Sequence, residues 1–287
     1  MKLKKLFLIL TAFVAFSSTL TAVSDYEYLL GKYRTMKKIA EEERLSAEKK
    51  ARMMKNAEYL EMLDAYLAVI PGKDYLMMKT EVTQKQWQTV MENNPSYFRG
   101  DDLPVEKVSW INAVEFCNAL SEKQNLEKCY SNGHWAYYDK KKNKDVTEKA
   151  YYKDKKGQVI KYYAIDCNFN ANGYRLPTVG EWQYAARGGE NYKYSGSDNL
   201  DEMGWYEYNS GGKTHPVAQK KPNGYGLYDM SGNVWEWCWD SSSKDRYFCG
   251  GSWDYNAYSC EVYFNYGDNA NSTDDNLGFR IVRSTGK

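Results

Sequence analysis

Two glycine- and aromatic-bearing strings near the C-terminus constrain the fold more than any other feature of the sequence. One is Gly-Gly-Ser-Trp at residues 250–253, and the other is Gly-Phe-Arg-Ile-Val at residues 278–282. We call this pair the frame. Between the two strings, residues 254–276 are almost all Asn, Asp, Tyr, Ser, Thr, Ala or Gly, and none is Lys or Arg. This C-terminal insert has neither the alternation of a strand nor the period of a helix. The fold must therefore hold an irregular segment between two packed strings.

The composition of the C-terminal insert is typical of an adaptable binding surface. Its tyrosines lie among small polar residues. Tyrosine provides a large contact area at a low entropy cost, while Ser, Gly and Asn provide adaptable hydrogen bonds. A polar surface loop without a binding role is the alternative, because many loops carry tyrosine.

The balance of charge argues against a nucleic-acid partner. The 287-residue chain has a formal net charge of +1, whereas nucleic-acid-binding domains are usually clearly basic. Residues 129–170 combine tyrosine pairs with lysine-rich turns, but acidic residues dilute the positive charge. We interpret this region as β-hairpins that protrude from the domain, and we expect no nucleic-acid ligand.

The first 24 residues are typical of a secretory signal peptide. A basic start is followed by an apolar stretch over residues 6–22 and a small-residue exit at residues 22–24. An uncleaved membrane anchor is the alternative, but the apolar stretch is short for a spanning helix and contains several Ser and Thr residues. We therefore expect export to the periplasm, the cell surface or the medium, with no membrane span after cleavage.

Two further segments follow this leader. Residues 25–66 lack proline and are dense in Lys, Glu, Met, Ala and Leu, which predicts a charged helix. Its imperfect heptad is compatible either with a solvated stalk or with a partner helix in an oligomer. Residues 67–287 form the main domain, with a boundary signal at Pro71-Gly72.

Helix signals in the main domain are local and few. Thr83 is a good N-cap for a helix over residues 84–93, and Ser109 for a helix over residues 110–122. A third, short helix follows Pro177, with Trp182, Tyr184 and Ala185 expected to face inward. The rest of the second half predicts small strands and ordered loops.

Cysteine usage leaves the pairing open. An even number of cysteines in an exported chain permits disulfides without requiring them. Cys117 lies within an apolar helical pattern and is expected to be a buried free thiol. Cys129 and Cys167 flank the predicted hairpins and are the first candidate pair. The six cysteines are Cys117, Cys129, Cys167, Cys238, Cys249 and Cys260.

Several strings, taken together, resemble the formylglycine-generating enzyme (sulfatase-modifying factor) family. They are Glu-Val-Thr-Gln at 81–84, Gly-Tyr-Arg-Leu-Pro-Thr at 173–178, and Gly-Leu-Tyr-Asp-Met-Ser-Gly-Asn-Val-Trp-Glu-Trp at 226–237, together with 104–110, 181–189 and the frame. They occur in the family's order over residues 67–284. The resemblance implies an α+β class of C-type-lectin-like fold, of the formylglycine-generating-enzyme type, with little regular secondary structure and here preceded by an N-terminal helix.

The same resemblance predicts that the chain is not an enzyme. Enzymes of the family oxidise a substrate cysteine with two copper-binding cysteines that lie just after the Gly-Gly-Ser-Trp string. Cys260 falls on the second position, but Tyr255 occupies the first, and one soft ligand does not make a copper site. An iron-dependent branch uses histidines, whereas His134 and His215 lie far apart in this sequence. We therefore expect no catalytic residues and no catalytic cofactor.

A structural calcium ion is also implied by the resemblance. Asp229 and Glu236 would supply carboxylate oxygens, and Gly232 and Val234 would supply backbone carbonyls, a suitable hard-oxygen set. Alternatively, Asp229 caps a turn and Glu236 pairs with a basic residue. The sugar-binding calcium motifs of true lectins are absent from the sequence, so calcium-dependent sugar recognition is not expected.

The C-terminal insert is similar to that of the variable proteins of diversity-generating retroelements, which include a treponemal variable protein. In those proteins, mutation of adenines in Asn codons yields residues such as Asn, Asp, Tyr, Ser, Ala and Gly near the C-terminus. The resemblance implies an exported ligand-binding protein that presents a variable surface to an unknown protein or cell-surface ligand. The expected contact residues are Asp254, Tyr255, Asn256, Tyr258, Ser259, Glu261, Tyr263, Asn265, Tyr266 and Asp268.

Two other functions remain open on the sequence. A cell-envelope scaffold or interaction protein would use the N-terminal helix and the lysine-rich hairpins. A copper-dependent formylglycine-generating oxidase is the least favoured, because of Tyr255.

Overall fold

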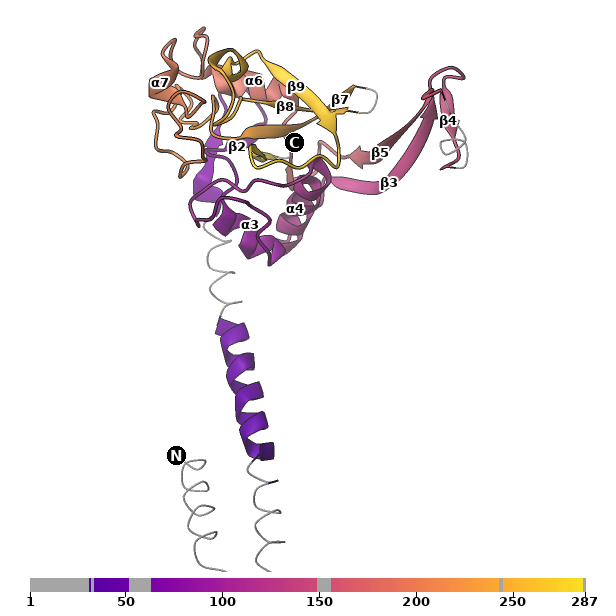
Figure 1. Cartoon of the computed structure of the whole chain (residues 1–287), viewed down its shortest axis with the longest axis vertical. Coiled ribbons are helices and arrows are strands. Elements are labelled where there is room, and N and C mark those ends of the chain that lie inside the picture. The colour runs from indigo at the N-terminus through magenta and orange to yellow at the C-terminus, as the bar shows by residue number, and fades with distance from the viewer. Residues whose placement is uncertain (1–30, 32–33, 52–62, 149–155, 243–244, 286–287) are drawn as a thin grey trace, which may run out of the picture. The chain divides into compact units, whose positions relative to one another are not determined.

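The computed structural model describes residues 31, 34–51, 63–148, 156–242 and 245–285. Contacts divide the chain into two compact units, Met1–Tyr59 and Leu60–Lys287. In the first unit residues 34–51 are helical, as expected for that range (Figure 1). The expected signal peptide and the rest of the first unit, apart from Gly31, lie outside the described residues. Among the helices that the structure does describe, none is long and apolar enough to cross a membrane.

The predicted N-terminal helix does not extend to residue 66 as an α-helix. Residues Leu63–Tyr66 form a 3-10 turn, η1, and strand β1 (Leu67–Val69) follows directly. Leu63 is buried, and its turn leads into the main sheet. Tertiary packing therefore replaces helical continuation at this point.

Three sheets build the second unit (Figure 1). The first has the order β1-β2-β11-β6 and is antiparallel throughout, so it joins the two ends of the domain. The second has the order β10-β7-β8-β9, and the third has the order β4-β3-β5. Their bounds are β2 Tyr75–Met78, β3 Tyr130–Asp139, β4 Lys144–Val146, β5 Val159–Cys167, β6 Tyr174–Arg175, β7 Trp235–Ser242, β8 Asp245–Cys249, β9 Asn265–Asn269, β10 Leu277–Gly278 and β11 Val282–Ser284.

Three of the helices begin where the sequence predicts. Helices α3 (Gln84–Met91), α4 (Trp110–Lys123) and α6 (Val179–Arg187) are capped by Thr83, Ser109 and Thr178, each through a capping box. In each box the cap hydroxyl accepts from the third helical N–H, whose own side chain accepts from the cap N–H. A further short helix, α7, spans Leu200–Met203. Because these signals act within three residues, the sequence alone predicts them well.

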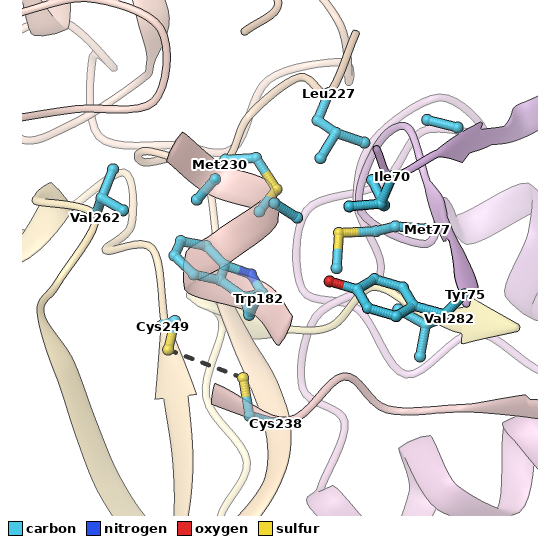
Figure 2. Close-up of a cluster of buried hydrophobic side chains, with 13 residues drawn as sticks. Ile70, Tyr75, Met77, Trp182, Leu227, Met230, Cys238, Cys249, Val262 and Val282 are labelled. Carbon is cyan, nitrogen blue, oxygen red and sulfur yellow. Dashed lines mark hydrogen bonds between the residues drawn. The ribbon is translucent and has the colours of Figure 1, made fainter. Parts of the chain in front are cut away.

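The core of the second unit gathers side chains from distant strands around Trp182 (Figure 2). Trp182 is fully buried on α6 and lies among Met77, Met230 and Val282. Ala185 is buried as expected, whereas Tyr184 is half-buried and donates to the carbonyl of Pro71. Burying apolar surface of this kind contributes roughly 25 cal/mol per Å².

The region at 130–167 forms the predicted hairpins, as the β4-β3-β5 sheet that extends from the rest of the unit (Figure 1). Its base is held by Arg246, which lies over the Trp110 ring at 3.8 Å and donates to the carbonyls of Trp239 and Tyr163. All six cysteines are free thiols, and Cys117 is buried as predicted. The candidate bridge between Cys129 and Cys167 is therefore not formed in this structure.

Candidate ligand-binding surface

The frame is buried and tied to the body of the domain. Gly251, Ser252 and the string at residues 278–282 are buried. The carbonyl of Gly250 accepts from Gly232 at 2.7 Å, and that of Phe279 accepts from Val82 at 2.9 Å. Trp253 is half-buried, and its indole N–H donates to the carbonyl of Asp275 at 3.2 Å. Both ends of the C-terminal insert are therefore held by the domain.

Polar side chains within the C-terminal insert fix its path. Asp254 accepts from Ser252 Oγ at 2.7 Å, and both of its oxygens accept from Asn276 Nδ2 at 3.0 Å. These contacts close the insert at its two ends. Asn256 caps the 3-10 helix η2 (Ala257–Cys260) by accepting from Ser259 N–H. Asp254 and Asn256 are exposed as predicted, and they also shape the surface.

Four tyrosines of the insert are the large exposed side chains of this surface. The exposed fractions are 42% for Tyr255, 64% for Tyr258, 51% for Tyr263 and 60% for Tyr266. Asn265 and Asp268, on β9, are exposed as well. We call these four tyrosines, with Tyr208 described below, the tyrosine patch.

Two of the expected contact residues are placed differently. Ser259 is only 6% exposed, so its assignment to the binding surface was wrong; its side chain faces Asn256 within η2. Glu261 is half-buried and pairs with Lys193 at 3.8 Å. The insert is irregular, so sequence alone provides no period from which the inward positions can be assigned.

Buried or half-buried rings contact three tyrosines of the patch. Trp235, at 2% exposure, contacts Tyr255 edge-on with ring centroids 5.3 Å apart. Phe248 packs under Tyr266 at 5.8 Å, and Phe264 contacts Tyr258 at 5.1 Å. Aromatic pairs of this geometry are each worth about 0.5–1.5 kcal/mol beyond their area burial. Tyr255, Tyr258 and Tyr266 are therefore exposed rings that rest on packed aromatic side chains.

The structure adds a residue that sequence reasoning missed. Tyr208 is 80% exposed, and the neighbouring Glu207 N–H donates to the carbonyl of Tyr255 at 3.1 Å. Ser210 Oγ donates to the carbonyl of Trp253 at 2.7 Å, which holds the same loop against the frame. Nearly fifty residues of sequence separate the two segments, and no motif signals their contact.

Cys260 is poorly placed for thiolate chemistry. It is fully buried and packs against Gly251, where any Cβ would lie 2.9 Å from the Cys260 Cα. Burial raises the pKa of its thiol to about 12. Over the residues described, no group of three or more His, Cys, Asp or Glu side chains is arranged to hold a metal ion.

The predicted calcium set does not fit the geometry around Glu236. Glu236 and Arg280 form a fully buried ion pair, in which Nε and Nη2 of Arg280 each donate at 2.6 Å to a different carboxylate oxygen. Trp182 Nε1 donates to the same carboxylate at 2.7 Å. Glu236 thus pairs with a basic residue, the alternative that the sequence left open. Gly232 and Val234 lie buried in the same segment, and calcium binding stays a prediction that these side chains do not support.

Two more buried carboxyl groups surround this ion pair. Asp229 accepts from the Ala218 N–H at 2.7 Å through Oδ2, whereas its buried Oδ1 has no hydrogen-bond partner among the described residues. Burial raises the pKa of Asp229 to about 6, against the lowering effects of the Ala218 hydrogen bond and of Arg280. Burial and the charges of Asp229 and Glu236 raise the pKa of Glu81 well above its usual range.

This arrangement predicts a definite pH dependence of stability. Folded Asp229 holds its proton up to pH about 6, whereas the ordinary value is 3.8. Between these values the folded state binds more protons than the unfolded state, so the free energy of unfolding falls as pH rises. Asp229→Asn should flatten that fall, since Asn tolerates the positive φ of 56° at this position. Urea titrations between pH 4 and 7 measure the free energy of unfolding of the parent and of Asp229→Asn, and the exposed Asp268→Asn is the control. If the free energy of unfolding of Asp229→Asn falls with pH as steeply as that of the parent, the prediction is wrong.

Fold and surface together define a class of protein: a C-type-lectin-like domain of the formylglycine-generating-enzyme type, with short strands, few helices and an irregular exposed insert near the C-terminus. The sulfatase-modifying factor enzyme 1-like domain model matches residues 50–285. The chain belongs to this family.

Relatives of different kinds resemble the chain. A solved structure, Treponema denticola variable protein 1, is similar with a TM-score of 0.60 and 34% identity, covering 76% of this chain and 91% of that one. Chaperone protein LppX of Paenibacillus barcinonensis is 40% identical over 238 residues, covering 74% of this chain and 80% of that protein. Formylglycine-generating enzyme of Streptomyces coelicolor is 41% identical over 90 residues, covering 26% of this chain and 29% of that enzyme. The resemblance to both the enzyme family and the variable proteins is confirmed.

Proposed function

We propose that this chain is an exported, non-catalytic ligand-binding protein that presents the C-terminal insert as a variable surface on a rigid C-type-lectin-like scaffold. The observation that carries the proposal is the contrast between the buried frame and the exposed C-terminal insert. The frame is buried and hydrogen-bonded, while four tyrosines of the insert project between its ends. Function then depends on exposed side chains that a fixed scaffold positions, as in antibody loops.

The absence of catalysis is part of the proposal. Tyr255 occupies the position at which the family's enzymes carry a first copper-binding cysteine, and a phenol is a poor substitute for a soft thiolate ligand. Cys260, at the second position, is buried with a raised pKa. The ligand is an unknown protein or cell-surface molecule, and the segment at 25–66 offers a route to oligomers.

Deep sequencing of codons 250–282 in a population of source cells tests the proposal. We expect substitutions confined to residues 254–276 and concentrated at codons that contain adenine, while the frame stays constant. The frame codons in the same reads are the internal control. A single invariant sequence across the population would contradict a diversified binding surface.

The tyrosine patch should be dispensable for folding. We expect each single change of Tyr255, Tyr258 or Tyr263 to Ala to lower the free energy of unfolding by at most about 1.5 kcal/mol, because each exposed ring loses one aromatic or cation contact. By contrast, Trp235→Ala should cost about 3–5 kcal/mol, as large core truncations do. Thermal denaturation followed by circular dichroism distinguishes them. A loss in the tyrosine variants as large as that in Trp235→Ala would show that the tyrosines belong to the core.

A second candidate function is that of a cell-envelope scaffold or interaction protein. The similarity to a protein named as a chaperone favours it, and the extended β4-β3-β5 sheet with its exposed Lys140 and Lys142 offers a separate contact surface. A photo-crosslinking residue placed at Tyr258 or at Lys142 in cells separates the two. Crosslinks from position 142 alone would support the scaffold, and crosslinks from position 258 alone would support the binding surface.

A further inference from the structure

We propose that the tyrosine patch recognises a basic polypeptide segment, one that inserts Arg or Lys side chains between the exposed rings. This inference rests on the proposed binding function and specifies the chemistry of the ligand. Three features of the described surface point to a cationic partner: its uncompensated negative charge, the contacts its tyrosines already make, and an unused hydrogen-bond donor beneath them.

Carboxylates outnumber cations around Tyr255. Asp254 precedes Tyr255 and accepts from Asn276 Nδ2 at 3.0 Å, while Trp253 donates to the Asp275 carbonyl, so the carboxylates at 274–275 lie beside Asp254 and Tyr255. Burial raises the pKa of the Tyr255 hydroxyl, and the charges of Asp254 and Asp274 accordingly raise it further. Asp275 also has a raised pKa, through partial burial and then the charges of Asp274 and Asp254. None of these aspartates forms an ion pair within 4.0 Å with a described Lys or Arg. A surface of this kind attracts a positive partner and repels a negative one.

The basic side chains near the patch offset only part of its negative charge, because Arg187 over Tyr263 and Lys107 near Asp275 are fewer than the aspartates Asp254, Asp268, Asp274 and Asp275. Lys193 is engaged with Glu261 at 3.8 Å. Arg246 pairs through its backbone with Asp268, but its guanidinium lies over Trp110 and donates to two carbonyls. Lys107 opposes Asp275 and partly lowers its pKa. Asp268 remains exposed two residues from Tyr266, on the same face of β9.

Two tyrosines, Tyr263 of the patch and Tyr97 outside it, already hold cations from this chain. The Arg187 guanidinium lies over the Tyr263 ring at 4.4 Å, and Lys107 lies 5.7 Å from the Tyr97 centroid. Contacts of this type are worth about 0.5–1 kcal/mol at exposed sites and more when desolvated. Tyr255, Tyr258 and Tyr266 have no such partner among the described residues. Their rings are free to receive a guanidinium or ammonium group from outside.

An unused donor lies directly beneath Tyr255. Trp235 is 2% exposed, and its indole Nε1 has no hydrogen-bond partner among the described residues. Its ring contacts Tyr255, Phe248 and Phe264, so the buried donor belongs to the base of the patch. Leaving such a group unpaired carries a desolvation penalty. Because this N–H is itself buried, a bound segment would reach it only when the rings above it turn aside; a polypeptide would then supply a backbone carbonyl as acceptor, which a simple cation does not.

Panning a phage-displayed random peptide library against the purified full chain tests the inference. We expect enriched peptides to be rich in Arg and Lys, and to bind at least about tenfold more weakly when NaCl rises from 50 to 500 mM, because exposed charges are screened by salt. Asp268→Asn and Asp274→Asn should each weaken binding by about two- to fivefold, as expected for exposed charge pairs. Asp166→Asn, on β5 outside the patch, is the matched control and should have no effect.

The outcomes separate this inference from the proposed function. Peptides that lose binding in Tyr255→Ala or Tyr258→Ala but are acidic or uncharged would overturn the cationic partner and leave the binding surface intact. Peptides indifferent to both tyrosine changes would overturn the binding surface itself. Basic peptides that respond to Tyr258→Ala and to Asp274→Asn, but not to Asp166→Asn, are the supporting result.

Discussion

Replacing Glu236 by Gln is expected to lower the free energy of unfolding by about 3–5 kcal/mol, the usual cost of leaving one buried charge without its partner. Glu236 and Arg280 are both fully buried, with 2.6 Å contacts between them. Gln would keep the shape but remove the negative charge from beside the guanidinium. Arg280 would retain the carbonyls of Met78, Lys79 and Tyr228 and a single neutral amide oxygen in place of the charged carboxylate. Equilibrium denaturation in urea measures the loss.

An exposed ion pair of similar length is the matched control. Lys221 and Glu202 approach to 2.7 Å, but their side chains are 68% and 43% exposed. Glu202→Gln should leave the denaturation midpoint unchanged within error, because solvent screens exposed pairs. If Glu236→Gln lowered the free energy of unfolding as little as Glu202→Gln, burial would not explain the contribution of the Glu236–Arg280 pair to stability.

Gly251→Ala is the second change with a large expected effect. Gly251 has a φ of +75°, and a Cβ there would lie 2.9 Å from Cα and 3.0 Å from N of Cys260. We expect a loss of about 1–2 kcal/mol from the left-handed backbone and about 1–3 kcal/mol more from the forced displacement of a packed neighbour. Cys260 ends η2, so the same displacement should disturb the tyrosine patch.

Gly226→Ala isolates the steric part of that cost. Gly226 has the same φ of +75°, but nothing lies within 4 Å of its added Cβ. The difference in unfolding free energy between the two variants therefore measures the contact with Cys260 rather than backbone strain. Equal losses of unfolding free energy in Gly251→Ala and Gly226→Ala would mean that Cys260 moves away from the added Cβ at little cost, so that the frame does not hold the insert rigidly.

The sequence predicted which residue types form the binding surface better than it predicted which individual residues are exposed. Exposure of the four insert tyrosines agrees with their setting among small polar residues. Ser259 is as polar as its neighbours, yet it is buried because η2 turns it toward the domain. Tyr208 joins the patch through a backbone hydrogen bond to Tyr255 that no local pattern encodes.

Local chemistry was decided by the sequence alone. The caps at Thr83, Ser109 and Thr178 act within three residues of each capping residue. The motifs shared with the family identify the fold class. Only the tertiary structure decided which charges meet: Glu236 faces Arg280, 44 residues away. The physical reason is that hydrogen bonds of a cap close within one turn, whereas burial and ion pairing depend on which distant segments the fold brings together.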